Sequence, residues 1–189
     1  MAAPVTIYTC AITSRQDSPE LLRAAVRDWC RRDSRPIPDL TVTRPQYGKP
    51  CLRHAPEIQF SVTHSGEYWM CAVSLQKVGL DLQAAQRAQT QKIARRFFHP
   101  REAGYLQEHP GDFFKVWSAK ESYVKFTGQG IDSSFSDFSV VGTQGLLDQL
   151  NGVRLRLWPF CEGYSLCLCC EDTSRVLFVP LTQESRSRS

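Results

Sequence analysis

The sequence lacks a long apolar run. None of its 189 residues belongs to a stretch that approaches the ~20 consecutive apolar residues needed by a membrane-spanning helix. The N-terminus, Met1-Ala2-Ala3-Pro4, has no basic start of the kind that precedes the apolar core of a signal peptide. We therefore expect a cytoplasmic protein that does not use a membrane as its partner.

The sequence also lacks a strong charge of either sign. Lysine and arginine number 23 and aspartate and glutamate 19, which gives a net charge of +4. Two of the basic residues, Arg186 and Arg188, fall in a tail at residues 181–189 that we expect to be disordered. A mildly basic body suits an anionic small ligand or an acidic partner and gives little support to a nucleic-acid partner. Charge alone favours the simpler interpretation, which is a solvated surface with a slight excess of positive charge.

The eight cysteines lack the spacing of a zinc site. Cys167, Cys169 and Cys170 cluster near the C-terminus, without paired C-x-x-C motifs and without a histidine nearby. Free cysteine packs as a small hydrophobic residue, so we expect buried, reduced thiols on strands.

The first part of the chain predicts strands around one helix. Residues 5–12 are typical of a strand, and Ser18, Pro19 and Glu20 predict a helix start with Ser18 as the N-cap. The apolar face of this helix follows at i, i+3, i+4 and i+7: Leu22, Ala25, Val26 and Trp29. Three further strands are expected over residues 40–43, 58–64 and 68–74, with the last two joined in a hairpin by residues 65–67.

The second part of the chain predicts three helices between strands. We expect a strand over residues 77–83, then helices over residues 86–98, from Pro100, and from Asp112 to about residue 126, the last stopped by Gly128 and Gly130. Four strands follow, over residues 137–141, 153–160, 164–170 and 176–179. The element order indicates an α+β fold with two similar halves, each a helix packed on a small antiparallel sheet. We place the halves at residues 1–75 and 76–180.

Four short segments stand in order along the chain. They are YGKP at residues 47–50, FSVTHSG at 60–66, VGLDLQ at 78–83 and WSAKESYVK at 117–125, followed by Gly128. In order and spacing they resemble the Sfp-type 4′-phosphopantetheinyl transferases, over about residues 22–170. The resemblance implies an enzyme that moves the phosphopantetheine arm of coenzyme A onto a serine of an apo acyl or peptidyl carrier protein. It also implies Mg²⁺ dependence, a pseudo-symmetric monomer, and an N-terminal half that binds coenzyme A.

Acidic and amide side chains in these segments form a candidate metal site. Asp81 and Gln83 are two apart on an expected strand, so they leave the same face of the sheet. Mg²⁺ is commonly held by one or two carboxylates together with substrate phosphates and water. From the residues alone, a metal ligand and an exposed acid at a strand end are equally good interpretations of Asp81. The resemblance implies that Asp81, Gln83 and Glu121 are the metal ligands.

Glu121 and Lys125 share a helix face, because they are i and i+4. The simple alternative is a solvated ion pair worth roughly 0.3–0.5 kcal/mol. The resemblance implies catalytic roles instead. Glu121 would also be the base for the carrier serine, and Lys125 would bind the pyrophosphate and assist the leaving group.

Four further residues are candidates for coenzyme A binding through the resemblance. It implies that His64 contacts a phosphate, that Thr63 supplies a hydroxyl or backbone donor, and that Arg44 and Lys49 meet the 3′-phosphate and adenine region. Loop or surface positions remain the alternative for the charged residues, Arg44 above all.

Two departures from the family pattern leave a second function open. Family members usually carry glutamate at Gln83, and longer members have a basic segment before the first conserved helix, where this chain offers only Arg15. A non-catalytic binder of coenzyme A or of carrier proteins is therefore the alternative. Retention of Asp81, Glu121 and Lys125 favours the enzyme.

Overall fold

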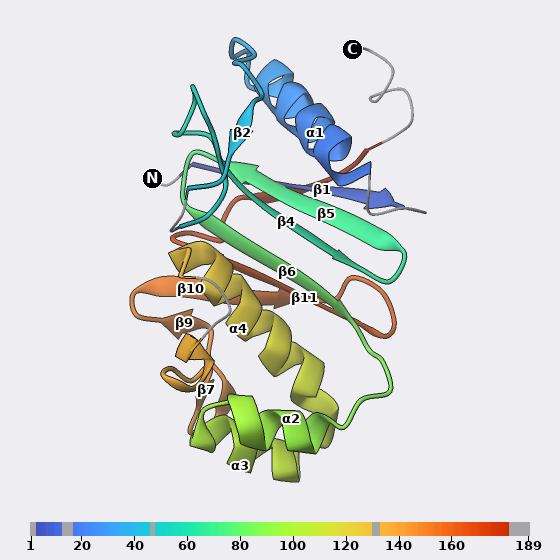
Figure 1. The fold of residues 1–189 in the computed structure, drawn as a ribbon, viewed down its shortest axis with the longest axis vertical. Helices are drawn as coiled ribbons and strands as arrows, with labels where there is room; N and C mark the ends of the chain where they lie inside the picture. Colours follow the sequence, from blue (N-terminus) through green and yellow to red (C-terminus); the bar gives the residue numbers. More distant parts are fainter. Residues whose placement is uncertain (1–2, 13–16, 46–47, 130–132, 182–189) are drawn as a thin grey trace.

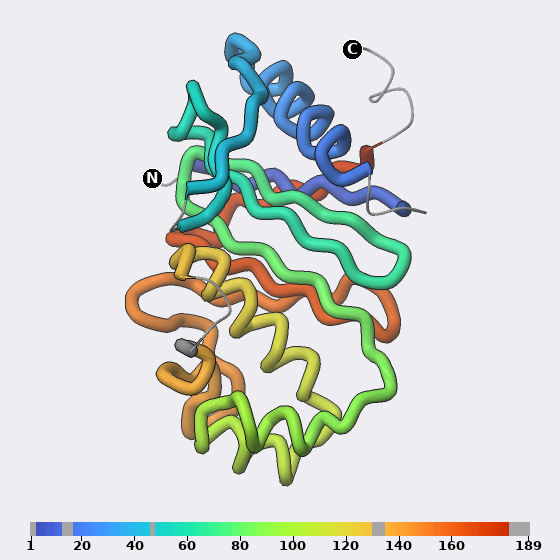
Figure 2. Tube along the Cα trace, in the orientation of Figure 1, coloured from blue at the N-terminus to red at the C-terminus, as the bar shows by residue number. Residues whose placement is uncertain are grey.

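The computed structural model describes residues 3–12, 17–45, 48–129 and 133–181. Two four-stranded sheets stack along the long axis of the molecule, and each has a long helix on it (Figure 1). The chain forms the first helix and most of the first sheet before it enters the second sheet, and its last strand returns to the first sheet (Figure 2). The predicted α+β class is confirmed.

The first sheet and its helix are built from the N-terminal elements together with the last strand of the chain. Helix α1 (Ser18–Arg32) buries its expected apolar face, including Val26 and Trp29, against the sheet. The sheet has the order β12-β1-β5-β4, and a two-stranded β2-β3 ribbon lies beside it. The strands are β1 (Val5–Ala11), β2 (Val42–Thr43), β3 (Cys51–Leu52), β4 (Gln59–Ser65), β5 (Tyr68–Ser74) and β12 (Val176–Pro180).

The second group follows from β6 onward. Its sheet has the order β6-β11-β10-β9, with α4 on one face and α2 and α3 at the far end (Figure 1). The helices are α2 (Thr90–Phe97), α3 (Pro100–Glu108) and α4 (Phe113–Thr127). The strands are β6 (Val78–Ala84), β7 (Val141–Gly142), β8 (Gly145–Leu146), β9 (Gln149–Leu150), β10 (Val153–Trp158) and β11 (Tyr164–Cys170).

The last strand returns to the first sheet. Strand β12 lies parallel to β1, with Val5 opposite Val176, so that sheet is mixed and not purely antiparallel as expected. Leu181 is buried and its N–H donates to the carbonyl of Thr9 at 2.8 Å. The division of the chain at residues 75 and 76 stays a prediction, and the rest of the expected tail lies outside the described residues.

Side-chain hydroxyls join the two sheets where β4 runs beside β6. Alternate residues of β4 place their hydroxyl oxygens where backbone N–H groups of β6 can donate to them, as expected for side chains on one face of a strand. The three bonds run from Leu80 N to Ser61 Oγ (2.9 Å), from Leu82 N to Thr63 Oγ1 (3.1 Å) and from Ala84 N to Ser65 Oγ (2.9 Å). We call this set the hydroxyl seam.

Helix α4 lies directly on β6. A Cβ atom at Gly79 would meet the carbonyl oxygen of Ser122 at 2.0 Å and the backbone nitrogen of Phe126 at 2.5 Å. Only glycine permits this approach, because any side chain would push the helix away from the strand. The contact brings the C-terminal half of α4 beside β6.

Three local predictions are wrong. The first helix takes Asp17 as its N-cap, and the hydroxyl of Ser18 accepts from Trp69 Nε1 at 2.9 Å instead. The second helix begins only at Thr90, and the chain before it is still paired at Ala85, whose N–H donates to the carbonyl of Gly163 at 2.6 Å.

The third wrong prediction is the strand expected over residues 137–141. Strand β7 begins only at Val141. The backbone before it is used by side chains, because the Phe138 carbonyl accepts from Lys120 Nζ and the Val140 N–H donates to Glu102. A backbone that is committed to side chains cannot pair with a neighbouring strand at the same groups.

The stop of the third helix is confirmed. Gly128 adopts the left-handed conformation at the C-cap of α4, with φ of 80°. Gly130 lies outside the described residues. None of the helices in the described part of the chain has the length and apolarity to cross a bilayer.

Candidate functional site

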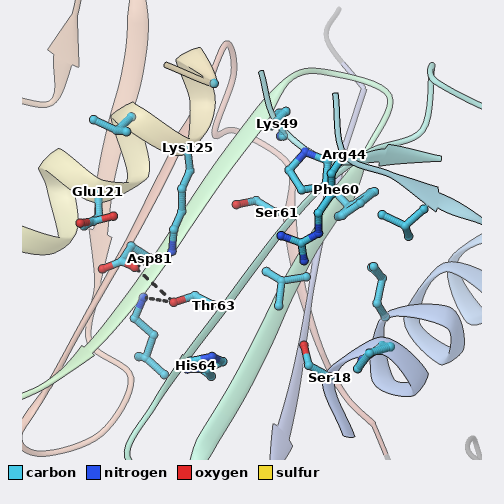
Figure 3. Close-up of a pocket in the computed structure, with 18 of the residues that line it drawn as sticks. Ser18, Arg44, Lys49, Phe60, Ser61, Thr63, His64, Asp81, Glu121 and Lys125 are labelled. Atoms are coloured by element: carbon cyan, nitrogen blue, oxygen red, sulfur yellow. Dashed lines mark hydrogen bonds and ion pairs between the residues drawn. The ribbon is translucent and has the colours of Figure 1, made fainter. Parts of the chain in front are cut away.

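One large pocket lies across the hydroxyl seam. It has a volume of about 1360 Å³ and is walled by α1, β4, β6, α4 and the segment around Lys49. Figure 3 shows labelled side chains from both sheets and from two helices converging on it. All eight predicted site residues line this pocket: Arg44, Lys49, Thr63, His64, Asp81, Gln83, Glu121 and Lys125.

Asp81 lines the pocket, and only one of its two carboxylate oxygens is hydrogen-bonded among the described residues. Its Oδ1 accepts from Lys125 Nζ at 2.7 Å and from the Thr63 hydroxyl at 3.2 Å. Its Oδ2 is buried and has no hydrogen-bond partner among the described residues. Burial raises the pKa of this carboxyl, and the ammonium of Lys125 opposes the rise. An unpaired carboxylate oxygen in such a place favours a cationic ligand.

Glu121 adds a second carboxylate from α4. Its side chain is 5% exposed, which excludes the solvated ion pair with Lys125 considered above. Burial, with repulsion from Asp81 in second place, raises its pKa to about 7. Lys125, one turn further on, pairs with Asp81 and also donates to the Leu80 carbonyl at 3.2 Å. The acid and the lysine therefore flank Asp81 from the same helix.

These residues fit a divalent cation that takes only a few of its ligands from the protein. Within the described ranges no group of three or more histidine, cysteine or acidic side chains gathers, so the pocket offers two carboxylates. Gln83 lines the same pocket and its amide nitrogen donates to the Ala84 carbonyl at 3.1 Å. Two carboxylates suit Mg²⁺ when phosphate oxygens and water supply the other ligands.

The remaining predicted residues give the pocket a basic rim. Lys49 Nζ donates to the Val78 carbonyl at 2.6 Å, and burial, with repulsion from Lys77 next, lowers its pKa to about 8. Arg44 is exposed beside the pocket, and the buried Nδ1 of His64 has no partner in the described part of the chain. Both phosphate oxygens and bases could bind at such donors.

Sequence reasoning missed the apolar wall of the pocket. The lining includes the apolar residues Leu22, Val42 and Phe60, and Phe60 lies beside Arg44 in Figure 3. Phe60 lies inside a quoted segment, but its position on the pocket side depends on the register of β4 and not on a motif. Arg23 also lines the pocket and is ion-paired with Glu20. Arg15 and Tyr47 lie outside the described residues.

Sequence reasoning also gave no role to Lys120, although it stands within the fourth quoted segment. Its side chain is 0% exposed, and it forms an ion pair with Glu102, which is equally buried. It therefore points away from the pocket and into the core under α4. Glu102, the acid in the first turn of α3, is the partner of Lys120. The two residues are 18 positions apart, so no local pattern in the sequence indicates that they pair.

Comparison with known proteins decides the family. The model of the 4′-phosphopantetheinyl transferase superfamily matches residues 77–169, which carry Asp81, Glu121 and Lys125. The chain belongs to the 4′-phosphopantetheinyl transferase superfamily. The predicted resemblance to the Sfp-type members is confirmed by the curated relatives.

Three curated relatives show how much of the chain is similar in sequence to known proteins. A 4′-phosphopantetheinyl transferase of Bacillus subtilis is 38% identical over 135 residues, which cover 66% of this chain and 60% of the relative. Sfp of Bacillus subtilis strain 168 is 30% identical over 142 residues (69% and 63%), and gsp of Aneurinibacillus migulanus is 31% identical over 158 residues (78% and 65%). The chain thus spans less than two thirds of the length of each of these relatives.

Proposed function

We propose that this protein transfers the 4′-phosphopantetheine arm of coenzyme A to a serine of an apo acyl or peptidyl carrier protein, in a Mg²⁺-dependent reaction. The observation that carries the proposal is the cluster of Asp81, Glu121 and Lys125 on the pocket floor, one carboxylate oxygen of which has no partner among the described residues. Membership of the superfamily supports the same activity.

The pocket suits an elongated, polyanionic nucleotide. Its volume of about 1360 Å³ exceeds the ~300–1000 Å³ of sites for drug-sized ligands. Lys125 would bind the pyrophosphate and His64 another phosphate oxygen of coenzyme A, and Arg44 and Lys49 would meet the 3′-phosphate and adenine region. The apolar wall with Phe60 would accept the adenine ring, since flat apolar rings pack well on aromatic side chains.

The side chains divide the chemistry between them. Glu121, with a pKa near 7, would take the proton from the serine hydroxyl as its oxygen bonds to the β-phosphorus. The bond from that phosphorus to the bridging oxygen breaks, and adenosine 3′,5′-bisphosphate leaves with its charge beside Lys125. Asp81 and Glu121 would hold Mg²⁺, with Gln83 next to them. The ion supplies charge stabilisation at the pyrophosphate when bound.

Finer features of the fold belong to the same proposal. We propose two similar halves, residues 1–75 for coenzyme A binding and 76–180 for metal and catalysis, with β12 crossing back to the sheet of the first half. We further propose that the protein acts as a cytoplasmic monomer and needs neither a membrane nor a nucleic acid. The mild net charge of +4 agrees with an acidic protein partner.

The test is incubation with coenzyme A, Mg²⁺ and a panel of apo carrier proteins, read by intact mass. We expect at least one carrier to gain one phosphopantetheine group, and the gain to vanish when its acceptor serine is replaced by alanine or Mg²⁺ is chelated. The Glu121→Gln variant is the matched protein control. Absence of any gain across a broad panel would overturn the proposal.

A non-catalytic binder is the second candidate, and Gln83 favours it. An amide brings no charge to the metal site, where family members usually carry a third carboxylate. Such a protein would bind coenzyme A or an apo carrier and yield no mass gain. Calorimetry with coenzyme A on the same preparation therefore separates the two functions.

A further inference from the structure

Thr63 differs from the other two residues of the hydroxyl seam. Its hydroxyl has two hydrogen-bond partners among the described residues, whereas the hydroxyls of Ser61 and Ser65 each accept one bond from β6. Thr63 Oγ1 accepts from the Leu82 N–H at 3.1 Å and lies 3.2 Å from Asp81 Oδ1. A hydroxyl carries a single proton. Because the Leu82 nitrogen is the donor in the first bond, the Thr63 proton is free to donate to the Asp81 carboxylate. Figure 3 draws both bonds meeting at Thr63.

We propose that Thr63 is a positioning residue, which fixes the Asp81 carboxylate across the seam so that Oδ2 is presented to the cation. The proposal rests on the proposed function. Oδ1 is occupied by Thr63 and Lys125, so Oδ2 is the oxygen left for a ligand. Thr63 is 5% exposed, and its hydroxyl proton is used by the Asp81 carboxylate.

The seam itself supplies an internal comparison. Ser61 and Ser65 accept from β6 N–H groups at the same distance, 2.9 Å, and so share the joining role of Thr63. Position 63 differs in having a β-branched residue, whose stiff χ1 holds the hydroxyl in one direction. A serine there would join the sheets equally well but would orient the carboxylate less firmly.

The contact can be tested without any ligand. In a double-mutant cycle of Thr63→Val with Asp81→Ala, we expect a coupling of about tenfold in the unfolding equilibrium constant, because hydrogen bonds to charged groups are the stronger ones. Asp81→Ala removes a carboxyl that burial disfavours, so the fold should tolerate it. The matched cycle of Ser65→Ala with Asp81→Ala should be additive. Equal coupling in the two cycles would overturn the assigned contact.

The positioning role is tested by titrating Mg²⁺ into the coenzyme A-bound protein by calorimetry. We expect Thr63→Val to weaken Mg²⁺ binding about tenfold, as loss of a group that orients a ligand commonly does. Ser65→Ala should bind as the wild type does, and Thr63→Ser should recover most of the affinity. At saturating Mg²⁺ the KM for coenzyme A should stay near the wild-type value in Thr63→Val while kcat falls, because the coupling between the two ligands then no longer lowers coenzyme A binding.

The outcomes are distinct. Unchanged Mg²⁺ affinity with a raised KM for coenzyme A in Thr63→Val would make Thr63 a nucleotide contact and overturn the inference alone. A wild type that binds coenzyme A but gains no Mg²⁺ in its presence would overturn the proposed function, and with it the positioning role.

Discussion

Two of the lysine–carboxylate pairs on helix α4 have the same chemistry but different surroundings. Lys120 and Glu102 are both 0% exposed, and the lysine lies 3.0 Å and 2.8 Å from the two carboxylate oxygens. Lys125 is 28% exposed, and its partner Asp81 keeps one oxygen without a partner in the described part of the chain. We call them the closed pair and the open pair.

The closed pair has all its bonding capacity filled. Lys120 donates to the Phe138 carbonyl at 2.8 Å and lies over the Phe138 ring, 4.0 Å from its centroid. Glu102 accepts from the N–H groups of Val140 and His99 as well. Buried pairs of this kind are retained for the arrangement they specify more than for net stability. The closed pair therefore fixes α4, and the open pair is left to meet a ligand.

The largest expected effect is loss of turnover at the open pair. Lys125→Met should fold, because its side chain is 28% exposed and the Asp81 carboxyl, whose pKa burial already raises, can take up a proton when the ammonium is gone. Its transfer rate should fall about 100- to 1000-fold. Glu121→Gln should lose about 100- to 10,000-fold through loss of the base. Intact-mass time courses measure the rates, and circular dichroism checks the fold. Near wild-type rates in folded variants would remove the distinction between the pairs.

The next effect is loss of stability at the closed pair. Lys120→Met leaves Glu102 buried without its counter-ion and should cost about 3–5 kcal/mol in the free energy of unfolding. Lys120→Met/Glu102→Gln removes both charges, keeps an oxygen for the Val140 N–H, and should recover most of that loss. Denaturant unfolding measures both.

Lys115→Met is the matched control for the closed pair. Lys115 is on the same helix, pairs with Asp112 at 2.7 Å and is 53% exposed. Its replacement should change the free energy of unfolding by less than about 0.5 kcal/mol. An equally small change for Lys120→Met would contradict the structural role of the closed pair.

A smaller effect on activity is expected at Lys49. This lysine is intermediate between Lys120 of the closed pair and Lys125 of the open pair. It is half-buried, its pKa is lowered to about 8, and it lines the pocket. Lys49→Met keeps the apolar stem and should raise the KM for coenzyme A about tenfold, since one charge-assisted contact is lost. Dephospho-coenzyme A should reproduce part of the loss in the wild type. If wild type and variant use both donors equally well, Lys49 is a second structural lysine.

The smallest effect concerns the missing charge at Gln83. The wild type should bind Mg²⁺ weakly alone and more tightly with coenzyme A, with reciprocal coupling. Gln83→Glu should strengthen Mg²⁺ binding several-fold in the absence of coenzyme A and reduce that coupling, since a third carboxylate replaces part of the phosphate contribution. Calorimetry with and without coenzyme A measures both. Tight binding to the free wild type, unchanged in Gln83→Glu, would show that residue 83 does not face the ion.

The sequence predicts local structure well where one periodic pattern dominates. The apolar face of α1 and the stop of α4 at Gly128 follow from spacing and from glycine's conformational freedom. The residues expected at the site do gather in one pocket, because their segments follow known strand and helix positions. Their individual roles stay predictions.

Long-range contacts explain what the sequence could not predict. The parallel pairing of β12 with β1 joins residues about 170 positions apart, and no local signal encodes it. Lys120 is charged in the sequence and becomes buried only because Glu102 reaches it from α3. The strand expected over residues 137–141 is shortened by the same pair, since the Phe138 carbonyl and the Val140 N–H bond to it.

The most direct test of the account is the single-turnover transfer rate of Lys125→Met beside that of Lys120→Met/Glu102→Gln, at saturating coenzyme A and Mg²⁺. The account predicts that the doubly substituted protein transfers within about tenfold of the wild type, because neither replaced charge reaches the pocket. Lys125→Met should be at least about 100-fold slower while equally well folded. A reversed order, with a folded double variant that is inactive and a Lys125→Met protein that is fast, would contradict it.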